Sequence, residues 1–323
     1  MRAAQRLHYG PPSVIRVESL PRPEPGANEL LVRVVATTVS RTDCALLSAK
    51  PFVMRFIAGL TRPKRAVLGT DFAGRVEAVG ADVEGFAVGD RVFGINDMGL
   101  GTQAEYAAIP ADDAVATIPD GTSFAAAAAA LEGAWYAQSI VERASLRRGS
   151  RVLINGATGA IGSALLQLCV DLDARVTAVG NTKNLALLES LGAEAVIDYE
   201  RDDFTKRPGP YDYVFDAVGK STFGASRRLL AAGGVYCSTE LGPGAQNLLF
   251  AATTPLFRRR RVVFPVPVDR KAFLPVLCDL LARGRLKPVI DRAYALDDVR
   301  DAYAYAGSGQ KTGGVLLRLA DEE

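Results

Sequence analysis

The feature that most constrains the fold is a glycine-spaced turn, Asn155-Gly156-Ala157-Thr158-Gly159-Ala160-Ile161-Gly162, set between a strand-like run and a helix-like run. A dinucleotide-binding fold needs this arrangement. The first small residue permits a tight turn, Gly159 lets the backbone approach a pyrophosphate, and Gly162 lets the helix pack close to the strand. The free N–H groups at the start of the helix then hold the phosphates. The predicted phosphate-binding residues are therefore Ala157, Thr158, Gly159, Ala160, Ile161 and Gly162; the alternative is an ordinary glycine turn.

Strand-like runs alternate with helix-length runs from about residue 120 onward, and this alternation predicts a parallel sheet covered by helices on both faces. The first strand of the series precedes the glycine turn, and the series continues to a strand at 261–268 and a helix near 270–283. The expected elements are strands at 151–155, 175–179, 195–198, 213–217 and 234–238, and helices at 160–173, 182–191 and near 221–231.

The N-terminal part of the chain has a different pattern. Short apolar-alternating runs at 30–35, 73–79 and 90–94 are separated by glycine and proline, which predicts an open, barrel-like β domain. The 323 residues fit two domains. We expect a substrate domain at 1–118, completed by about 286–323, and a cofactor domain at 119–285.

Charge and hydropathy exclude several functional classes. The chain carries 38 basic and 36 acidic side chains, a net charge of +2, which argues against a dedicated binder of nucleic acid or of membrane surfaces. No apolar run approaches the ~18 residues that a membrane helix needs. The first residues lead into no apolar signal region. The expectation is a cytoplasmic protein that binds a small molecule.

The residues that usually bind metals are scarce. The four cysteines, at 44, 169, 237 and 278, form no closely spaced pair, and His8 is the only histidine. A disulfide framework, a cysteine zinc cluster and a Ser-His-Asp triad are therefore not expected. We predict no metal site.

The end of the second predicted strand indicates which cofactor is bound. Enzymes that use NAD commonly have a carboxylate here, about 20 residues after the glycine turn, to bind the ribose hydroxyls. This chain has instead Gly180, Asn181, Thr182 and Lys183. Gly180 leaves room, and the lysine can neutralise a 2′-phosphate that a carboxylate would repel. The pattern favours NADPH; the alternative is that Lys183 only caps an exposed helix start.

Three further motifs carry a family resemblance. Residues 68–74 (Leu-Gly-Thr-Asp-Phe-Ala-Gly), 88–94 (Val-Gly-Asp-Arg-Val-Phe-Gly) and 211–219 (Tyr-Asp-Tyr-Val-Phe-Asp-Ala-Val-Gly) resemble motifs of the medium-chain dehydrogenase/reductase superfamily. The resemblance covers nearly the whole chain and is closest to zinc-independent quinone oxidoreductases and to proteins called NAD(P)-dependent alcohol dehydrogenases. It implies an α/β protein with a GroES-like β-barrel domain and a Rossmann domain with a doubly wound parallel sheet.

The chain departs from the zinc-dependent members of that family. Ser40 stands where they have a cysteine, and Thr70 stands where they have a histidine. Residues 94–104, the region of their structural-zinc loop, contain no cysteine. The resemblance therefore implies chemistry without zinc.

The resemblance also implies individual site residues. Ser40 keeps a hydroxyl that can contact the nicotinamide ribose. Tyr136 replaces the usual threonine of a short turn and is a candidate donor to a carbonyl oxygen, although a tyrosine packed at the interdomain hinge is an equal alternative. Val218 ends the strand that lines the nicotinamide side. Tyr199 falls where relatives contact the adenine-ribose phosphate, or else packs at a sheet edge. Lys311 is a weaker cofactor candidate.

Together these observations predict a zinc-independent, NADPH-dependent reductase that transfers hydride to a quinone or an α,β-unsaturated carbonyl. Two alternatives stay open: a non-catalytic NADPH-binding protein of the sensor or crystallin kind, and a metal-free ketone or alcohol oxidoreductase. The family also implies a homodimer through the strand at 261–266. The apolar segment 51–60 fits either a flap over a substrate cleft or a surface helix.

Overall fold

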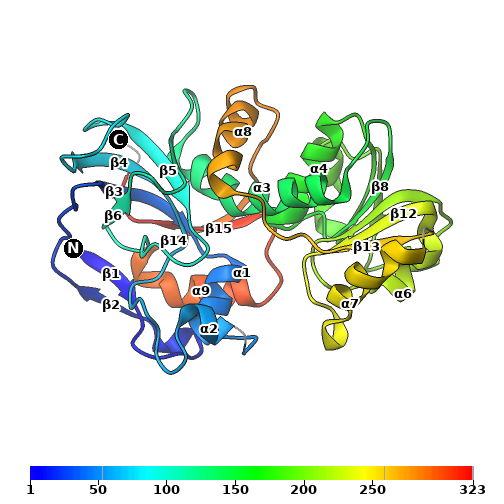
Figure 1. The fold of residues 1–323 in the computed structure, drawn as a ribbon, viewed down its shortest axis with the longest axis horizontal. Helices are drawn as coiled ribbons and strands as arrows, with labels where there is room; N and C mark the ends of the chain where they lie inside the picture. The colour runs from blue at the N-terminus through cyan, green and yellow to red at the C-terminus, as the bar shows by residue number, and fades with distance from the viewer. Residues whose placement is uncertain (53, 258, 322–323) are drawn as a thin grey trace. The chain divides into compact units, whose positions relative to one another are not determined.

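The computed structural model describes residues 1–52, 54–257 and 259–321 (Figure 1). Its described residues form two compact units. The first contains Met1–Glu132, Asp269–Gly284 and the segment from Pro288 onward, and the second contains Gly133–Val268 and Arg285–Lys287. These limits differ from the predicted 118 and 285.

The second limit differs because helix α8 (Arg270–Ala282) packs on the first unit. The guanidinium of Arg270 lies 3.1 Å from Asp113 Oδ1 at the start of the helix. Farther along, Cys278 Sγ lies 3.8 Å from the Thr117 carbonyl oxygen. Contacts between residues more than 150 positions apart in the chain cannot be derived from local sequence patterns.

The first unit is built on a mostly antiparallel seven-stranded sheet in the order β14-β15-β3-β4-β5-β7, with β6 paired to β3. A separate hairpin joins β1 and β2. The predicted strands at 30–35, 73–79 and 90–94 are confirmed as parts of β3, β4 and β5. The strands are β1 (Arg2–Gln5), β2 (Arg16–Ser19), β3 (Glu29–Thr38), β4 (Asp71–Val79), β5 (Arg91–Ile95), β6 (Tyr106–Pro110), β7 (Val115–Thr117), β14 (Ile290–Ala295) and β15 (Gly314–Arg318).

Three helices of this unit, α1 (Arg41–Ser48), α2 (Met54–Ala58) and α9 (Val299–Gly307), lie beside β1 and β2 (Figure 1). A buried cluster of aliphatic and aromatic side chains, including Leu47, Leu68 and Tyr303, joins α1 and α9 to β1. The segment 51–60 contains α2, but Val53 lies outside the described residues. That it acts as a flap stays a prediction.

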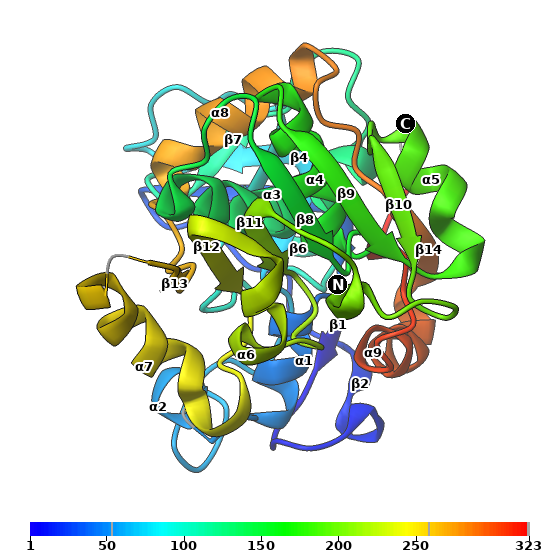
Figure 2. The ribbon, with the colours of Figure 1, turned by 90° about the vertical axis from the view of Figure 1, so that its right-hand side faces the viewer.

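The second unit holds a six-stranded parallel sheet in the order β10-β9-β8-β11-β12-β13 (Figure 2). Numbered from the first strand of the unit, this order is 3-2-1-4-5-6, the order of Rossmann folds. The predicted Rossmann domain is therefore confirmed. The strands are β8 (Arg151–Asn155), β9 (Arg175–Gly180), β10 (Ala195–Asp198), β11 (Tyr211–Asp216), β12 (Leu230–Ser238) and β13 (Arg261–Val263).

The helices of this unit follow its strands in turn, and α4 (Ala160–Asp171), α5 (Leu185–Ser190) and α7 (Gln246–Thr253) are clear elements. The long α3 (Phe124–Ala144) spans the division between the units. The helix predicted near 221–231 is wrong in its extent. It consists of α6 (Phe223–Ser226) and one 3₁₀ turn, because Leu230 already pairs with Tyr211 as the first residue of β12.

Strand β13 ends after three residues, so the strand predicted over 261–268 is too long. Pro265 and Pro267 have no N–H to donate to a ladder, which explains the early end. β13 is an edge strand of the sheet. The homodimer predicted through this edge stays a prediction.

The spacing of the glycine turn leads to a stability prediction. A Cβ on Gly162 would lie 2.1 Å from the Gly156 carbonyl oxygen and 2.8 Å from Ala157 Cα, whereas a Cβ on Gly159 would meet nothing closer than 3.7 Å. Gly162→Ala should lower the free energy of unfolding by about 1–3 kcal/mol or more. Gly159→Ala should change it by less than about 0.5 kcal/mol. Urea denaturation of both variants tests this, and a fully stable Gly162→Ala would contradict it.

Candidate functional site

The glycine turn lies at the switch point of the parallel sheet, where the strand order reverses between β8 and β11. Ligands of open α/β sheets bind at this point. The last residues of the two strands, Asn155 and Asp216, are register partners. Gly156 follows with φ of +77°, and a Cβ there would come within 2.7 Å of Val218 Cβ. The structure therefore brings the predicted Val218 against the predicted phosphate turn.

The start of helix α4 is arranged to accept an anion. Its N-cap is Gly159, and no side chain caps the exposed N–H groups there. The space that a Cβ on Gly159 would fill is open, so a phosphate can approach the backbone closely. Thr158, Ala160 and Ile161 are all half-buried around this space. Ala157 differs from them, because it is buried and its N–H already donates to Val179 O at 3.1 Å.

A buried carboxylate shapes the segment that follows β11. Asp216 accepts hydrogen bonds from Asn155 Nδ2 at 3.0 Å, from Ser221 N at 2.9 Å and from Val218 N at 3.3 Å. Burial raises its pKa, and these donors oppose the shift. Sequence reasoning missed Asp216 as an individual site residue. Its signal was its position as the last residue of the strand next to the glycine turn.

The predicted ribose end contains carboxylates after all. Thr182 Oγ1 donates to Asp198 Oδ2 at 2.5 Å, and Thr182 N donates to Glu200 Oε2 at 3.1 Å. Asp198 is the last residue of β10, and Glu200 lies two residues later. Because β10 pairs with β9, the ends of the two strands meet. The sequence shows no carboxylate at the end of β9 itself. The two carboxylates come from the end of β10, the neighbouring strand in the sheet.

The other residues predicted for this end lie near the same place. Gly180 is buried, and its carbonyl accepts a hydrogen bond from Tyr199 N at 3.0 Å. The Tyr199 side chain is 53% exposed. Asn181 Oδ1 accepts from Asn184 Nδ2 at 2.7 Å. Lys183 is exposed, and its side chain forms no ion pair in the part of the chain that the structure describes.

In the first unit, Ser40 begins helix α1 as one half of a capping box. Its Oγ accepts from Asp43 N at 3.0 Å, and Asp43 Oδ2 accepts from Ser40 N at 2.9 Å. Ser40 is buried, and its hydroxyl proton can still be donated. The spacing Ser-x-x-Asp is itself a signal for such a cap.

Asp43 and Asp71 are both buried, and their mutual repulsion adds to the effect of burial. Burial raises the pKa of Asp43 to about 8, with the charge of Asp71 as the next cause. Burial also raises the pKa of Asp71 to about 6, although hydrogen bonds from Thr38 and Thr37 limit the shift. Thr38 N donates to Asp71 Oδ1 at 2.7 Å. Sequence reasoning singled out neither carboxyl group.

Lys311 is a half-buried cation of the first unit. Its Nζ donates to Gly313 O at 2.7 Å. Burial lowers the pKa of Lys311, and the charge of Glu132 is the largest opposing effect. The charge of Cys44 also raises this pKa, and the charge of Arg41 lowers it. These neighbours belong to the first unit, and contact of Lys311 with a cofactor stays a prediction.

The short turn predicted around Tyr136 is wrong. Residues 132–137 lie inside the continuous helix α3, because the alanine-rich stretch that begins at 125 favours helix throughout. Tyr136 is half-buried, and its ring packs edge-on against Trp135 at a centroid distance of 5.4 Å. This contact agrees with the packed-tyrosine interpretation and leaves a role as donor untested.

Zinc does not fit the residues at the positions of the family's metal ligands. The Ser40 oxygen caps α1, and Thr70 Oγ1 donates to Asp43 Oδ2 at 3.3 Å. Zinc sites use thiolate, imidazole and carboxylate ligands instead of hydroxyl groups. Within residues 1–52, 54–257 and 259–321, no three His, Cys, Asp or Glu side chains are grouped to hold a metal ion.

Two family models match the chain. The alcohol dehydrogenase GroES-like domain matches residues 26–120, and a model described as zinc-binding dehydrogenase matches residues 191–317. The 2-methylene-furan-3-one reductase of Solanum lycopersicum is 31% identical, over 98% of this chain and 79% of that protein. A chloroplastic NADPH-dependent alkenal/one oxidoreductase of Arabidopsis thaliana is 28% identical over the same shares.

A solved structure extends the likeness to the whole fold. The quinone oxidoreductase from Coxiella burnetii superposes with a TM-score of 0.85 at 26% identity and covers 99% of both chains. The relatives described as reductases show that this chain is an oxidoreductase of a family that binds NAD(P). Among the residues that the structure describes, no helix is both long and apolar enough to cross a membrane.

The buried carboxyl groups predict how stability depends on pH. Between the ordinary pKa of 3.8 and the raised pKa of about 8, folded Asp43 keeps a proton that the unfolded chain has released. The free energy of unfolding should therefore fall as pH rises through this range, by up to about 1.4 kcal/mol per pH unit for each such group. Urea denaturation across pH values measures the slope. In Asp43→Asn, the free energy of unfolding should change less with pH above the pKa of Asp71. The exposed control Asp112→Asn should show the same slope as the wild type.

Proposed function

Because the chain belongs to the medium-chain dehydrogenase/reductase superfamily, in its quinone oxidoreductase-like branch, we propose that it is a zinc-independent, NADPH-dependent reductase of quinones or α,β-unsaturated carbonyl compounds. The observation that carries this proposal is the uncapped α4 terminus at the switch point of a Rossmann sheet, in a chain whose family positions for zinc hold hydroxyl groups. The names of the two plant relatives and of the solved quinone oxidoreductase support the acceptor class.

The contacts of the second unit support its role in binding the cofactor. The backbone at Thr158, Gly159 and the first turn of α4 would hold the pyrophosphate. Val218, directed by Asp216 against Gly156, would lie on the nicotinamide side. NADPH supplies the hydride when it is bound, and the protein supplies orientation and exclusion of water.

The acceptor must also receive a proton and have its developing oxyanion stabilised. The Ser40 hydroxyl is a candidate donor, because the capping contact uses its oxygen as an acceptor and leaves its proton available. Tyr136 is the second candidate. In the reduction of an enone, hydride adds to the β-carbon and the proton ends on the α-carbon, so the C=C bond is consumed.

Turnover without metal is the first expected result. Absorbance at 340 nm should fall when NADPH is mixed with 1,4-benzoquinone, 9,10-phenanthrenequinone or a panel of enals and enones, with EDTA present throughout. The identity of the best acceptor would narrow the substrate class. Turnover that is lost on metal stripping and restored by zinc would overturn the proposal. Saturable NADPH binding without oxidation would favour the non-catalytic alternative.

Lys183 should determine the preference for NADPH over NADH. Its ammonium has no competing ion pair among the described residues, whereas Asp198 and Glu200 are both hydrogen-bonded to Thr182. Lys183→Ala should raise the KM for NADPH about tenfold, because one charge-assisted contact is lost, and should leave the KM for NADH nearly unchanged.

The matched control is Lys206→Ala, which removes an exposed lysine of the same unit that pairs with Asp203 at 3.3 Å. It should change neither KM. A wild-type preference for NADH, or an equal effect of Lys183→Ala on both cofactors, would contradict the assignment. Glu200 would then become the candidate for binding ribose hydroxyls.

A further inference from the structure

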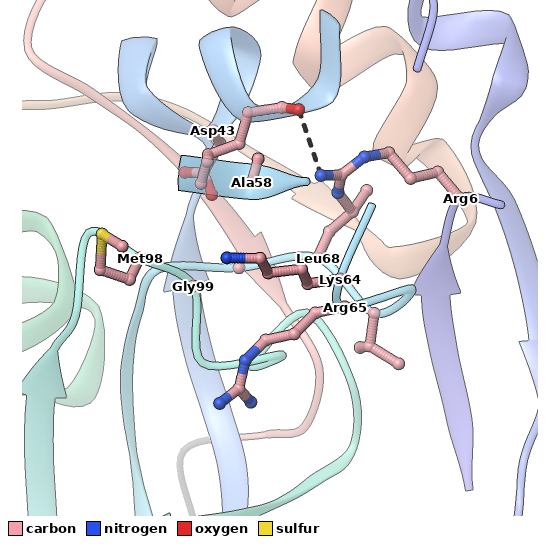
Figure 3. Close-up of a pocket in the computed structure, with 11 residues that line it drawn as sticks. Arg6, Asp43, Ala58, Lys64, Arg65, Leu68, Met98 and Gly99 are labelled. Carbon is pink, nitrogen blue, oxygen red and sulfur yellow. Dashed lines mark hydrogen bonds between the residues drawn. The ribbon is translucent and has the colours of Figure 1, made fainter. Parts of the chain in front are cut away.

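A pocket of about 180 Å³ opens within the first unit (Figure 3). Its walls come from the end of β1, from α1, from the segment 58–69 and from the turn after β5. Hydrogen bonds hold the segment 58–69 in place. Tyr9 OH donates to Gly59 O at 2.7 Å, and Lys64 N donates to Ala58 O at 2.8 Å.

Arg6 is the least satisfied group in this pocket. Only 6% of the residue is exposed, and its Nη2 donates to Leu46 O at 3.1 Å. Its Nε has no hydrogen-bond partner in the part of the chain that the structure describes. A buried guanidinium N–H without an acceptor is costly, and an anionic ligand would supply the missing acceptor.

Two more cations line the same pocket. Lys64 and Arg65 are exposed residues on its rim, and no carboxylate within the described residues forms an ion pair with either of them. Figure 3 shows the Arg6 guanidinium and the Lys64 amine directed toward one space, bordered by Asp43 and Ala58. The Arg65 guanidinium is directed away from that space. A surface cation that is directed toward a buried cation favours an anion.

Apart from Asp43, the rest of the lining is apolar. It consists of Leu46, Ala58, Val67, Leu68 and Met98, with two glycines. The volume is close to that of a cavity of about 150 Å³ that holds one benzene molecule. An apolar body of about six carbons therefore fits together with one acidic group.

We propose that this pocket binds a small amphipathic carboxylate of about the size of benzoate, with its acidic group at Arg6 and Lys64 and its apolar body against Leu46, Leu68 and Met98. The inference concerns binding by the first unit. It does not depend on the proposed reductase function.

The one carboxyl group in the lining is compatible with such a ligand. Burial and the charge of Asp71 raise the pKa of Asp43 to about 8. Near neutral pH the group is mostly protonated, so it does not repel an anion and can donate a hydrogen bond to it.

The test is isothermal titration calorimetry of the cofactor-free full-length chain with benzoate, at pH 6.5 and low ionic strength. We expect saturable binding with a Kd of about 1 mM or tighter. Benzamide, which has the same shape without the charge, should bind at least about tenfold more weakly. The absence of benzoate binding, or equal binding of benzamide, would overturn the proposal.

Variants of the rim residues distinguish binding at this site from attraction by general surface charge. Lys64→Gln should weaken benzoate binding about tenfold, because it removes one charge-assisted contact. Lys64 is exposed, so folding should be retained. Arg62→Gln removes an exposed cation of the same segment that does not line the pocket, and it should leave the Kd unchanged. An equal loss in Arg62→Gln would overturn the proposal.

A kinetic measurement identifies the source of the carboxylate once binding is established. If benzoate raises the KM of an acceptor without changing kcat, the pocket binds an acidic group carried by the substrate. If benzoate changes neither value, the pocket binds a separate ligand. Both outcomes require the measured binding, so failure of the reductase assay would leave the calorimetric test intact.

Discussion

The second unit depends on one close backbone contact. Gly162 lies against Gly156 so tightly that a single added carbon would meet the carbonyl oxygen at 2.1 Å. This approach seats α4 on β8 and points its uncapped N-terminus at the switch point of the sheet. Val218 closes the turn from the neighbouring strand. An anion site made of backbone N–H groups needs this packing, because backbone donors are positioned only by the elements that carry them.

In the first unit, hydrogen bonds stabilise the carboxyl groups near the positions where zinc-dependent relatives bind the metal. Where a metal would neutralise nearby negative charge, Asp43 is held by the cap of α1 and by Thr70, and burial favours its neutral form. Asp71 remains nearer to ionisation because Thr37 and Thr38 donate to it. The two buried acids thus have different pKa values because their hydrogen-bond donors differ. Proteins commonly give similar groups different pKa values in this way.

Positive charge is distributed differently at the two proposed anion sites. At the cofactor turn it is supplied by backbone dipoles, and the exposed Lys183 forms no ion pair with any residue that the structure describes. In the pocket of the first unit it is supplied by side chains, with Arg6 buried and Lys64 on the rim. Backbone donors suit a diphosphate that must lie along a helix end, whereas a cluster of flexible cations suits a small, compact acid.

Local sequence patterns were sufficient for the Rossmann turn, most strands and the missing zinc ligands, since each depends on residues close together in the chain. They failed where distant segments meet. The carboxylates at Thr182 arrive through the pairing of β9 with β10, and α8 joins the first unit through Arg270. The unpaired Nε of Arg6 exists only because folding buries it among residues 37 to 93 positions away. Periodicity and spacing are local properties of a chain, whereas burial and partner choice are properties of the packed molecule.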